Sequence, residues 1–412
     1  MTIAASWYRD LDPDGRRAFR SSYAGFSVEA MSVQLYSFVL PVLLPLWHLS
    51  PSAGGLLATV TLLSSAAGGW LAGLLSDRLG RVRVLQVTIV WMALSAMSCG
   101  LAQGYEQMFV ARMIQGFGFG AEWAVGAVFM GEIATAAARG RLVGTAQSAW
   151  AVGWGLAAAT STIAIALLPP DLGWRAAFFM SLPPAAAIFL ARMRLSESTI
   201  FLSSSGADTW HRIFSLRMCG NTARGCLLAV GTHGGYWALA TWWPTMLRLE
   251  RGMTAAQTAA HMAVLVGGSF AGYLLGASLS DRIGRRRTLV PFALGGIATV
   301  LIATELPVSD TALLMLGAPL GLFATGLYSA IGPVLNELYP TGLRGSGLGF
   351  CYNMGRGVAG AAPVAVGGSI AAFGIAHSIG IYVTVAYGLV LAAAAMLRET
   401  MGMDFALAQD GA

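Results

Sequence analysis

Apolar stretches alternate with short polar breaks along the chain from about residue 22 to residue 398. Most stretches hold roughly 20 nearly uncharged residues, the length that a helix needs to cross about 30 Å of hydrocarbon. The pattern predicts twelve membrane-spanning helices, near residues 22–46, 53–75, 83–103, 106–131, 142–168, 174–194, 224–247, 256–280, 288–306, 310–336, 346–372 and 375–398. We therefore expect an all-α membrane protein.

Composition supports a bilayer as the solvent of this chain. Of its 412 residues, 56% are hydrophobic and only 11% are charged, which is more apolar than a soluble core requires. The four cysteines show neither metal-ligand nor disulfide-framework spacing, so we assign them no function and expect no metal or cofactor.

Arginines mark one side of the membrane. With the N-terminus placed in the cytoplasm, nearly all loop arginines fall on the cytoplasmic side, Arg192 among them. This asymmetry supports an even number of spans with both termini cytoplasmic. The net charge of +6 thus sets membrane orientation, and we expect no nucleic-acid partner. Arg112 and Arg356 remain within predicted spans.

The two halves of the chain echo each other. The segment SDRLGR at 76–81 recurs as SDRIGR at 280–285, an offset of 204 residues. Glu132 and the arginine seven residues later recur at Glu337, an offset of 205. Both echoes fall between equivalent helices in the same orientation, which predicts a parallel repeat. The expected divisions are a cytoplasmic segment 1–21, a six-helix bundle 22–194, a cytoplasmic linker 195–222, a second bundle 223–398 and a cytoplasmic tail 399–412.

These motifs carry a family resemblance. GLLSDRLGRVRVL at 73–85 resembles the motif between the second and third helices of the major facilitator superfamily, and RMIQGFGFGAEW at 112–123 resembles its fourth-helix motif. The resemblance covers essentially the whole chain. It implies two six-helix bundles with both termini cytoplasmic, and a transporter in which the bundles rock about a central site.

Within the superfamily, GFGFGAEW, NELYPTGLRGSG and YNMGRG are most similar to proton symporters for organic acids, including the sialate, metabolite and aromatic-acid branches. The resemblance implies proton-coupled uptake of a small organic anion, such as an aromatic, hydroxy or sugar acid, with the proton as the coupling ion. In that group the first helix usually carries two acidic residues three apart. Here the matching positions hold Glu29 and Ser32, so one expected carboxylate is missing.

The resemblance also assigns a gating role to the repeated cytoplasmic loops. It implies a charge relay that stabilises the outward-open state and breaks when the cytoplasmic side opens. Its residues are Asp77, Arg78, Gly80, Arg81, Glu132 and Arg139 in the first half, and Asp281, Arg282, Arg285, Glu337 and Arg344 in the second.

Charged groups within the spans are candidates for function, because an ionisable side chain in hydrocarbon is costly unless a cavity or a partner receives it. Glu29 shares one face of the first span with Tyr36 and is the first candidate for a proton carrier, since a low dielectric favours a neutral carboxyl group. Glu122 is the second candidate. For both, a structural hydrogen-bonded or ion-paired role stays open.

One stripe of the fourth span carries Arg112, Gln115, Phe119 and Glu122 at helical spacing, and we expect it to face the central cavity. Arg112 and Glu122 are about 15 Å apart along the helix, so each needs a partner on another helix. We expect Arg112 and Gln115 to contact substrate. Interhelical ion pairing is an equal alternative for the two charged residues.

In the eleventh span Tyr352, Asn353 and Arg356 form a candidate anion site, with Arg356 as the anchor for a carboxylate. The alternative is that Arg356 pairs with Glu29 or Glu122. Aromatic and polar side chains on the fifth and seventh spans would suit a planar acid, although packing and interfacial anchoring are alternatives. These further binding candidates, with Tyr36, are Gln147, Trp154, His233, Tyr236 and Trp237.

Rival functions stay open. Proton-antiport efflux of drugs or metabolites would use the same charges with opposite coupling. A membrane sensor that binds a metabolite without moving it, or an intramembrane enzyme, ranks lower, and the chain has no HExxH or GxSxG motif. We expect a monomeric transporter, and no enzyme, in the bacterial cytoplasmic (inner) membrane, with an organic anion, protons and lipid as partners.

Overall fold

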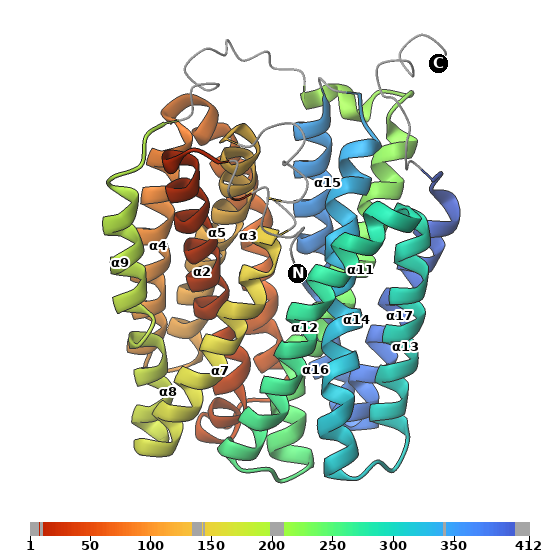
Figure 1. Cartoon of the computed structure of the whole chain (residues 1–412). Coiled ribbons are helices and arrows are strands. Elements are labelled where there is room, and N and C mark those ends of the chain that lie inside the picture. The colour runs from red at the N-terminus through yellow and green to blue at the C-terminus, as the bar shows by residue number, and fades with distance from the viewer. Residues whose placement is uncertain are drawn as a thin grey trace.

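A computed structural model of the chain describes residues 8, 11–133, 142, 145–197, 210–340 and 343–399. Its helices form two bundles that lie side by side (Figure 1). The first bundle contains α2 (Pro13–Leu46), α3 (Pro51–Leu79), α4 (Arg81–Leu101), α5 (Tyr105–Ile133), α7 (Ala149–Leu167), α8 (Pro170–Phe179) and α9 (Leu182–Arg192). The second contains η1 (Trp210–Phe214), α11 (Cys219–Thr245), η2 (Met246–Glu250), α12 (Ala255–Ile283), α13 (Arg285–Glu305), α14 (Asp310–Glu337), α15 (Arg344–Ala359), α16 (Ala361–Phe373) and α17 (Ile375–Met396). The predicted all-α fold is confirmed.

The helices account for twelve spans, with α8 and α9 forming the sixth span and α15 and α16 the eleventh. In the described part of the chain, ten spans are long and apolar enough to cross a membrane. The remaining two are α5 and α11. These two helices carry Arg112, Glu122 and His233 within their apolar stretches, and such polar side chains lower the hydropathy of a span.

Local sequence explains where the spans begin and break. α2 begins at Pro13 and not near residue 22, because the Asp12 side chain accepts a hydrogen bond from the Gly15 amide at 2.7 Å and proline suits a first turn. The sixth span breaks ahead of two prolines at the start of α9. The eleventh breaks at Gly360, between α15 and α16.

α4 and α13 begin without a side-chain cap of their own. Each follows a glycine with positive φ, Gly80 at 99° and Gly284 at 103°, a backbone conformation that other residues rarely adopt. Glu197, beyond α9, accepts hydrogen bonds from the first two amides of α4 at 3.0 and 3.1 Å. Glu399, beyond α17, accepts one from the first amide of α13 at 2.8 Å. The last span of each half thus leads into a cap for the third span of that half.

α3 and α5 pack backbone against backbone. A Cβ atom at Gly120 would meet the carbonyl of Ser65, and one at Gly116 would meet the carbonyl of Thr61. The glycines of the fourth-span motif therefore allow close helix approach. This contact fixes the position of Phe119 relative to α3.

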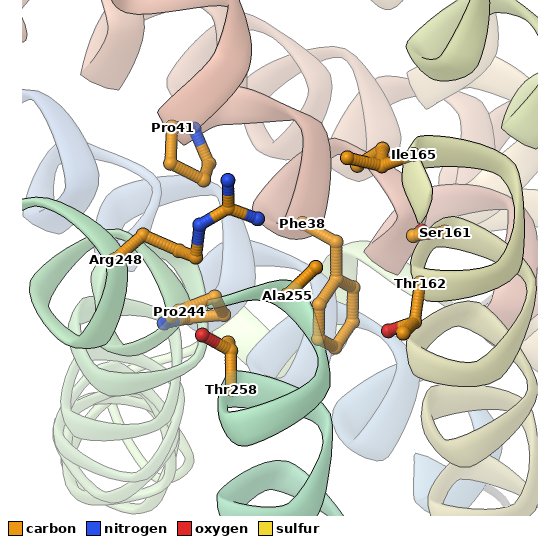
Figure 2. A pocket seen from close by; sticks show the side chains of 9 residues that line it. All are labelled: Phe38, Pro41, Ser161, Thr162, Ile165, Pro244, Arg248, Ala255 and Thr258. Atoms are coloured by element: carbon orange, nitrogen blue, oxygen red, sulfur yellow. The ribbon is translucent and has the colours of Figure 1, made fainter. Parts of the chain in front are cut away.

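The two halves meet along α2 with α11, α7 with α12, and α3 with α15 and α16. At the extracellular end this seam is tight, because a Cβ at Gly55 of α3 would meet the backbone of α16 at Pro363. Arg248 of the second half reaches toward Phe38 and Pro41 of the first (Figure 2). These side chains help to line a small extracellular-side cavity of about 250 Å³. Side chains of both halves thus close the extracellular end of the seam.

Candidate functional site

A cavity of about 340 Å³ lies at the seam between the two halves. Nine aromatic and three polar side chains line it: Phe26, Phe119, Trp123, Trp150, Tyr236, Trp237, Tyr273, Tyr328 and Tyr352, with Gln147, His233 and Arg356. Each of them is at most 8% exposed, so the cavity is closed to solvent in this state.

Arg356 is the charged side chain in this lining, and it is 2% exposed. Its guanidinium donates to Asn353 Oδ1 at 2.6 Å and to the Ser65 carbonyl at 3.4 Å, and lies 4.5 Å from the centroid of the Phe119 ring. Its Nε has no hydrogen-bond partner among the described residues. Asn353 therefore orients the guanidinium without neutralising its charge.

Tyr236 joins the two halves of the molecule. Its hydroxyl on α11 accepts hydrogen bonds from Trp150 Nε1 of α7 and, at 2.9 Å, from Gln34 Nε2 of α2. Trp154 packs against Tyr236, with ring centroids 5.5 Å apart, but is not part of the cavity lining. Of the aromatic candidates, Tyr236 and Trp237 line the cavity and Trp154 supports one of them from behind.

Glu29 is completely buried in α2, with 0% exposure. Neither of its carboxylate oxygens has a hydrogen-bond partner among the described residues. An ionised carboxylate without a partner is costly in such surroundings, whereas the protonated group is tolerated. Glu29 lies one turn along α2 from Phe26, which lines the cavity, so it is placed beside the site without being part of its wall.

Glu122 of α5 forms a buried ion pair with Arg192 of α9. Arg192 Nη1 donates to Oε2 at 2.9 Å, its Nη2 contacts Oε1, and Thr88 Oγ1 donates to Oε2 at 2.8 Å. Sequence placed Arg192 with the cytoplasmic loop arginines, and this placement is wrong for its side chain, which is 0% exposed within the bundle. Gly25 leaves the necessary room, since a Cβ there would meet both partners. In this state Glu122 therefore has the structural ion-paired role that the sequence left open.

Removing one partner of this pair is expected to destabilise the protein strongly. In Arg192→Gln the Glu122 carboxylate would stay buried without its cation, at a cost of about 3–5 kcal/mol. The double variant Glu122→Gln with Arg192→Gln should recover much of this loss, because neither charge remains. The melting temperatures of the wild type, the two single variants and the double variant, measured in detergent, give the contribution of the ion pair to stability. Equal melting temperatures for the wild type and Arg192→Gln would show that the pair is not a structural element.

The structure divides the stripe of α5 that was expected to face the cavity. Phe119 lines the cavity, but Arg112 and Gln115 are buried within the first half. Arg112 donates to Gln115 Oε1 at 2.5 Å and lies 4.5 Å from the centroid of the Tyr36 ring, and Gln115 donates to Ser32 Oγ at 3.0 Å. Arg112, Gln115 and Tyr36 are therefore absent from the cavity lining. Ser32, at the position of the missing acid, accepts the last hydrogen bond of this chain, which begins at the Arg112 guanidinium.

Charge clusters form at the cytoplasmic ends of both halves. Arg81 lies 2.7 Å from Asp77 and 3.1 Å from Glu132. Arg285 repeats this arrangement at 3.0 Å from each of two carboxylates, those of Asp281 and Glu337. Each of these ion pairs joins helices of a single half.

The outer members of the clusters remain solvated. Asp77 and Asp281 are 67% and 62% exposed, and Arg78 and Arg282 are exposed as well. Arg139 lies outside the described residues, as does the side chain of Arg344. The ion pairs are thus formed in a state whose central cavity is closed, and their role in gating stays a prediction.

Several residues of the cavity wall were not predicted from the sequence. Tyr273 of α12 and Tyr328 of α14 complete the aromatic wall. Their signal in the sequence was a tyrosine within an apolar span, which is equally typical of bundle packing. Phe26 and Trp123, also in the wall, cannot be told from packing residues by spacing at all.

Comparison with known proteins settles the family. The model described as Major Facilitator Superfamily matches residues 23–361 and 225–403. The chain belongs to that superfamily. A probable 4-methylmuconolactone transporter of Cupriavidus pinatubonensis is 35% identical to this major facilitator protein over 402 residues, covering 97% of this chain and 94% of the relative. A citrate-proton symporter of Klebsiella pneumoniae is 27% identical, over 71% of this chain and 70% of the relative.

A solved structure supports the fold of this major facilitator protein. The crystal structure of a D-xylose-proton symporter aligns with a TM-score of 0.76 at 20% identity, covering 94% of this chain and 99% of that chain. The family resemblance drawn from the sequence motifs and the twelve-helix architecture are confirmed. Family membership also makes the protein a multi-pass membrane transporter and not an enzyme.

Proposed function

We propose that this protein takes up a small organic anion together with protons across the bacterial cytoplasmic membrane. One observation carries the proposal. Arg356, a buried guanidinium with no carboxylate partner among the described residues, lies in a closed aromatic cavity between the two halves. An unneutralised cation in a water-poor cavity favours an anionic guest, and a guanidinium matches the geometry of a carboxylate.

The chemistry of the cavity wall supports a small planar acid. Its nine aromatic rings offer flat apolar surfaces, whereas a sugar acid would need many hydrogen-bonding groups around it. Among the acids that the sequence suggests, the aromatic and other planar acids therefore fit best.

The position of Glu29 supports symport. Glu29 and Arg356 are close enough for their charges to interact. A substrate anion at Arg356 would cancel the positive field that favours an ionised Glu29, and would thus promote proton binding there. By thermodynamic linkage the proton would in turn promote anion binding. Anion and proton then bind together, which is the requirement for symport.

The site also supports a monomeric unit and inward transport. Both walls of the cavity come from one chain, since α2, α5 and α7 supply one side and α11, α12, α14 and α15 the other. In bacteria the proton gradient points into the cell, so co-transport with protons loads the substrate inward. The relative named as a citrate-proton symporter is in accord with co-transport of an anion and protons.

Uptake into proteoliposomes tests the proposal. A panel of radiolabelled aromatic, hydroxy and sugar acids is offered under an imposed inward proton gradient, and counterflow is followed with substrate and proton tracked together. We expect at least one planar acid to accumulate, and a protonophore to collapse that accumulation. If no acid moves while neutral or cationic drugs exchange against protons, the rival efflux function replaces this one.

A further inference from the structure

His233 of α11 lines the central cavity and keeps one buried ring nitrogen without a hydrogen-bond partner among the described residues. Its Nδ1 lies 2.9 Å from the carbonyl oxygen of Ala229, one turn earlier in the helix. Because a carbonyl can only accept, Nδ1 carries the proton, and Nε2 of the neutral ring keeps its lone pair. Nε2 has no hydrogen-bond partner among the described residues, and the side chain is 1% exposed.

The surroundings of His233 favour the neutral ring. The imidazole meets the Tyr352 and Tyr328 rings edge to face, with centroids 4.6 and 5.1 Å away. Arg356 flanks the same Tyr352 ring, at 5.8 Å from its centroid. A second positive charge so close to an unneutralised guanidinium, and away from water, would be strongly opposed. The cavity therefore offers a cationic donor at Arg356 and a neutral acceptor at His233.

Two other polar groups of the wall are already engaged, and the hydroxyls of Tyr273 and Tyr328 can donate as well as accept, whereas Nε2 can only accept. The Tyr236 hydroxyl holds the Trp150 and Gln34 donors, and the Gln147 side chain is hydrogen-bonded to Tyr352. Nε2 of His233 is thus an acceptor that the protein itself leaves open inside an aromatic box. A buried acceptor without a donor is unfavourable, so a guest that supplies a donor gains affinity over one that cannot.

We infer that the site selects carboxylates that also carry a hydroxyl or N–H group, with the carboxylate at Arg356 and the donor at Nε2 of His233. The inference rests on the proposed function and narrows its substrate class. His233 is then a specificity residue, which favours substrates whose hydroxyl or N–H group can donate a hydrogen bond to Nε2. An acid of the same shape without a donor would leave Nε2 unpaired, and such sites reject donor-free analogues.

Matched pairs of ligands test this inference on the purified full-length protein. Isothermal titration calorimetry compares 2-, 3- and 4-hydroxybenzoate with the fluorobenzoate of the same substitution, because fluorine is close to hydroxyl in size but donates no hydrogen bond. In the wild type, we expect at least one hydroxybenzoate to bind about ten-fold more tightly than its fluoro partner. His233→Phe, which keeps a ring against both tyrosines, should abolish that preference, so that each hydroxybenzoate and its fluoro partner bind with equal affinity.

His261→Phe is the matched control. His261 also places Nδ1 against a carbonyl one turn earlier, that of Gln257 at 2.9 Å, but its Nε2 lies 3.1 Å from the Asp310 carbonyl, and it does not line the cavity. This variant should keep the hydroxyl preference. The inference is overturned if the wild type binds both members of every pair equally, or if the preference survives in His233→Phe. If the wild type binds none of these benzoates while the uptake panel still identifies a transported acid, this inference is overturned and the proposed function stands; if the panel also finds no transported acid, the proposed function fails.

Discussion

Glu29→Gln is expected to abolish proton-driven accumulation of substrate while leaving substrate exchange intact. The amide has the shape of a protonated carboxyl group but cannot release a proton, so the carrier would behave as permanently protonated. For one proton per substrate, a gradient of one pH unit supports about ten-fold accumulation, since one unit corresponds to about 1.4 kcal/mol. Glu29→Gln should lower this ratio to one. Uptake and counterflow in proteoliposomes measure the two activities separately.

The control for this experiment is Glu106→Gln. Glu106 is an exposed carboxylate in the first turn of α5, on the extracellular side, and its loss removes the same charge from the same half. It should accumulate substrate as the wild type does. Full gradient-driven accumulation in Glu29→Gln would exclude Glu29 as the coupling site and leave its burial as a structural feature.

Arg356→Gln is expected to weaken carboxylate binding about 100-fold. A hydrogen bond to a charged group contributes roughly 1.5–3 kcal/mol, and each 1.4 kcal/mol corresponds to about a ten-fold change in affinity. Arg356→Lys should restore only part of the loss, because an ammonium group lacks the planar fork that matches a carboxylate. Binding is measured by titration calorimetry with the acid that the uptake panel identifies.

Two comparisons separate an anchoring role from a packing role. The neutral amide of the same acid should bind the wild type and Arg356→Gln alike, because it lacks the charge that Arg356 reads. Arg194→Gln, which removes an exposed arginine of the cytoplasmic side, should leave acid binding unchanged. If Arg356→Gln lost equal affinity for the acid and the amide, Arg356 would support the cavity wall without binding the carboxylate.

The fold was predictable because a bilayer restricts what a sequence can mean. Roughly 20 uncharged residues in a row have few structural interpretations, and the repeat at 76–81 and 280–285 gave the relation between the halves. Arg356 was predictable for a similar reason. A guanidinium deep within an apolar span is so costly that a cavity or a partner has to receive it.

Other parts of the site depend on geometry that spacing does not encode. Arg192 ends its span, where a long basic side chain usually extends to the membrane surface. It turns inward because Gly25, on a distant part of the chain, opens the space beside Glu122. The spacing of polar residues on α5 predicted which residues share a helix face, but not which helices pack against that face. The same face contacts the cavity at Phe119 and the interior of the first half at Arg112.

The caps that Glu197 and Glu399 provide for α4 and α13 occur in both halves, whereas the buried charges do not. Glu29 belongs to the first half and Arg356 to the second. Under the proposed function, gene duplication kept the helix caps in both halves, whereas the functional charges diverged. The first half binds the proton, and the second half binds the anion. Each half can then evolve its own specificity, provided that contacts such as Phe119 against Arg356 keep the two in communication.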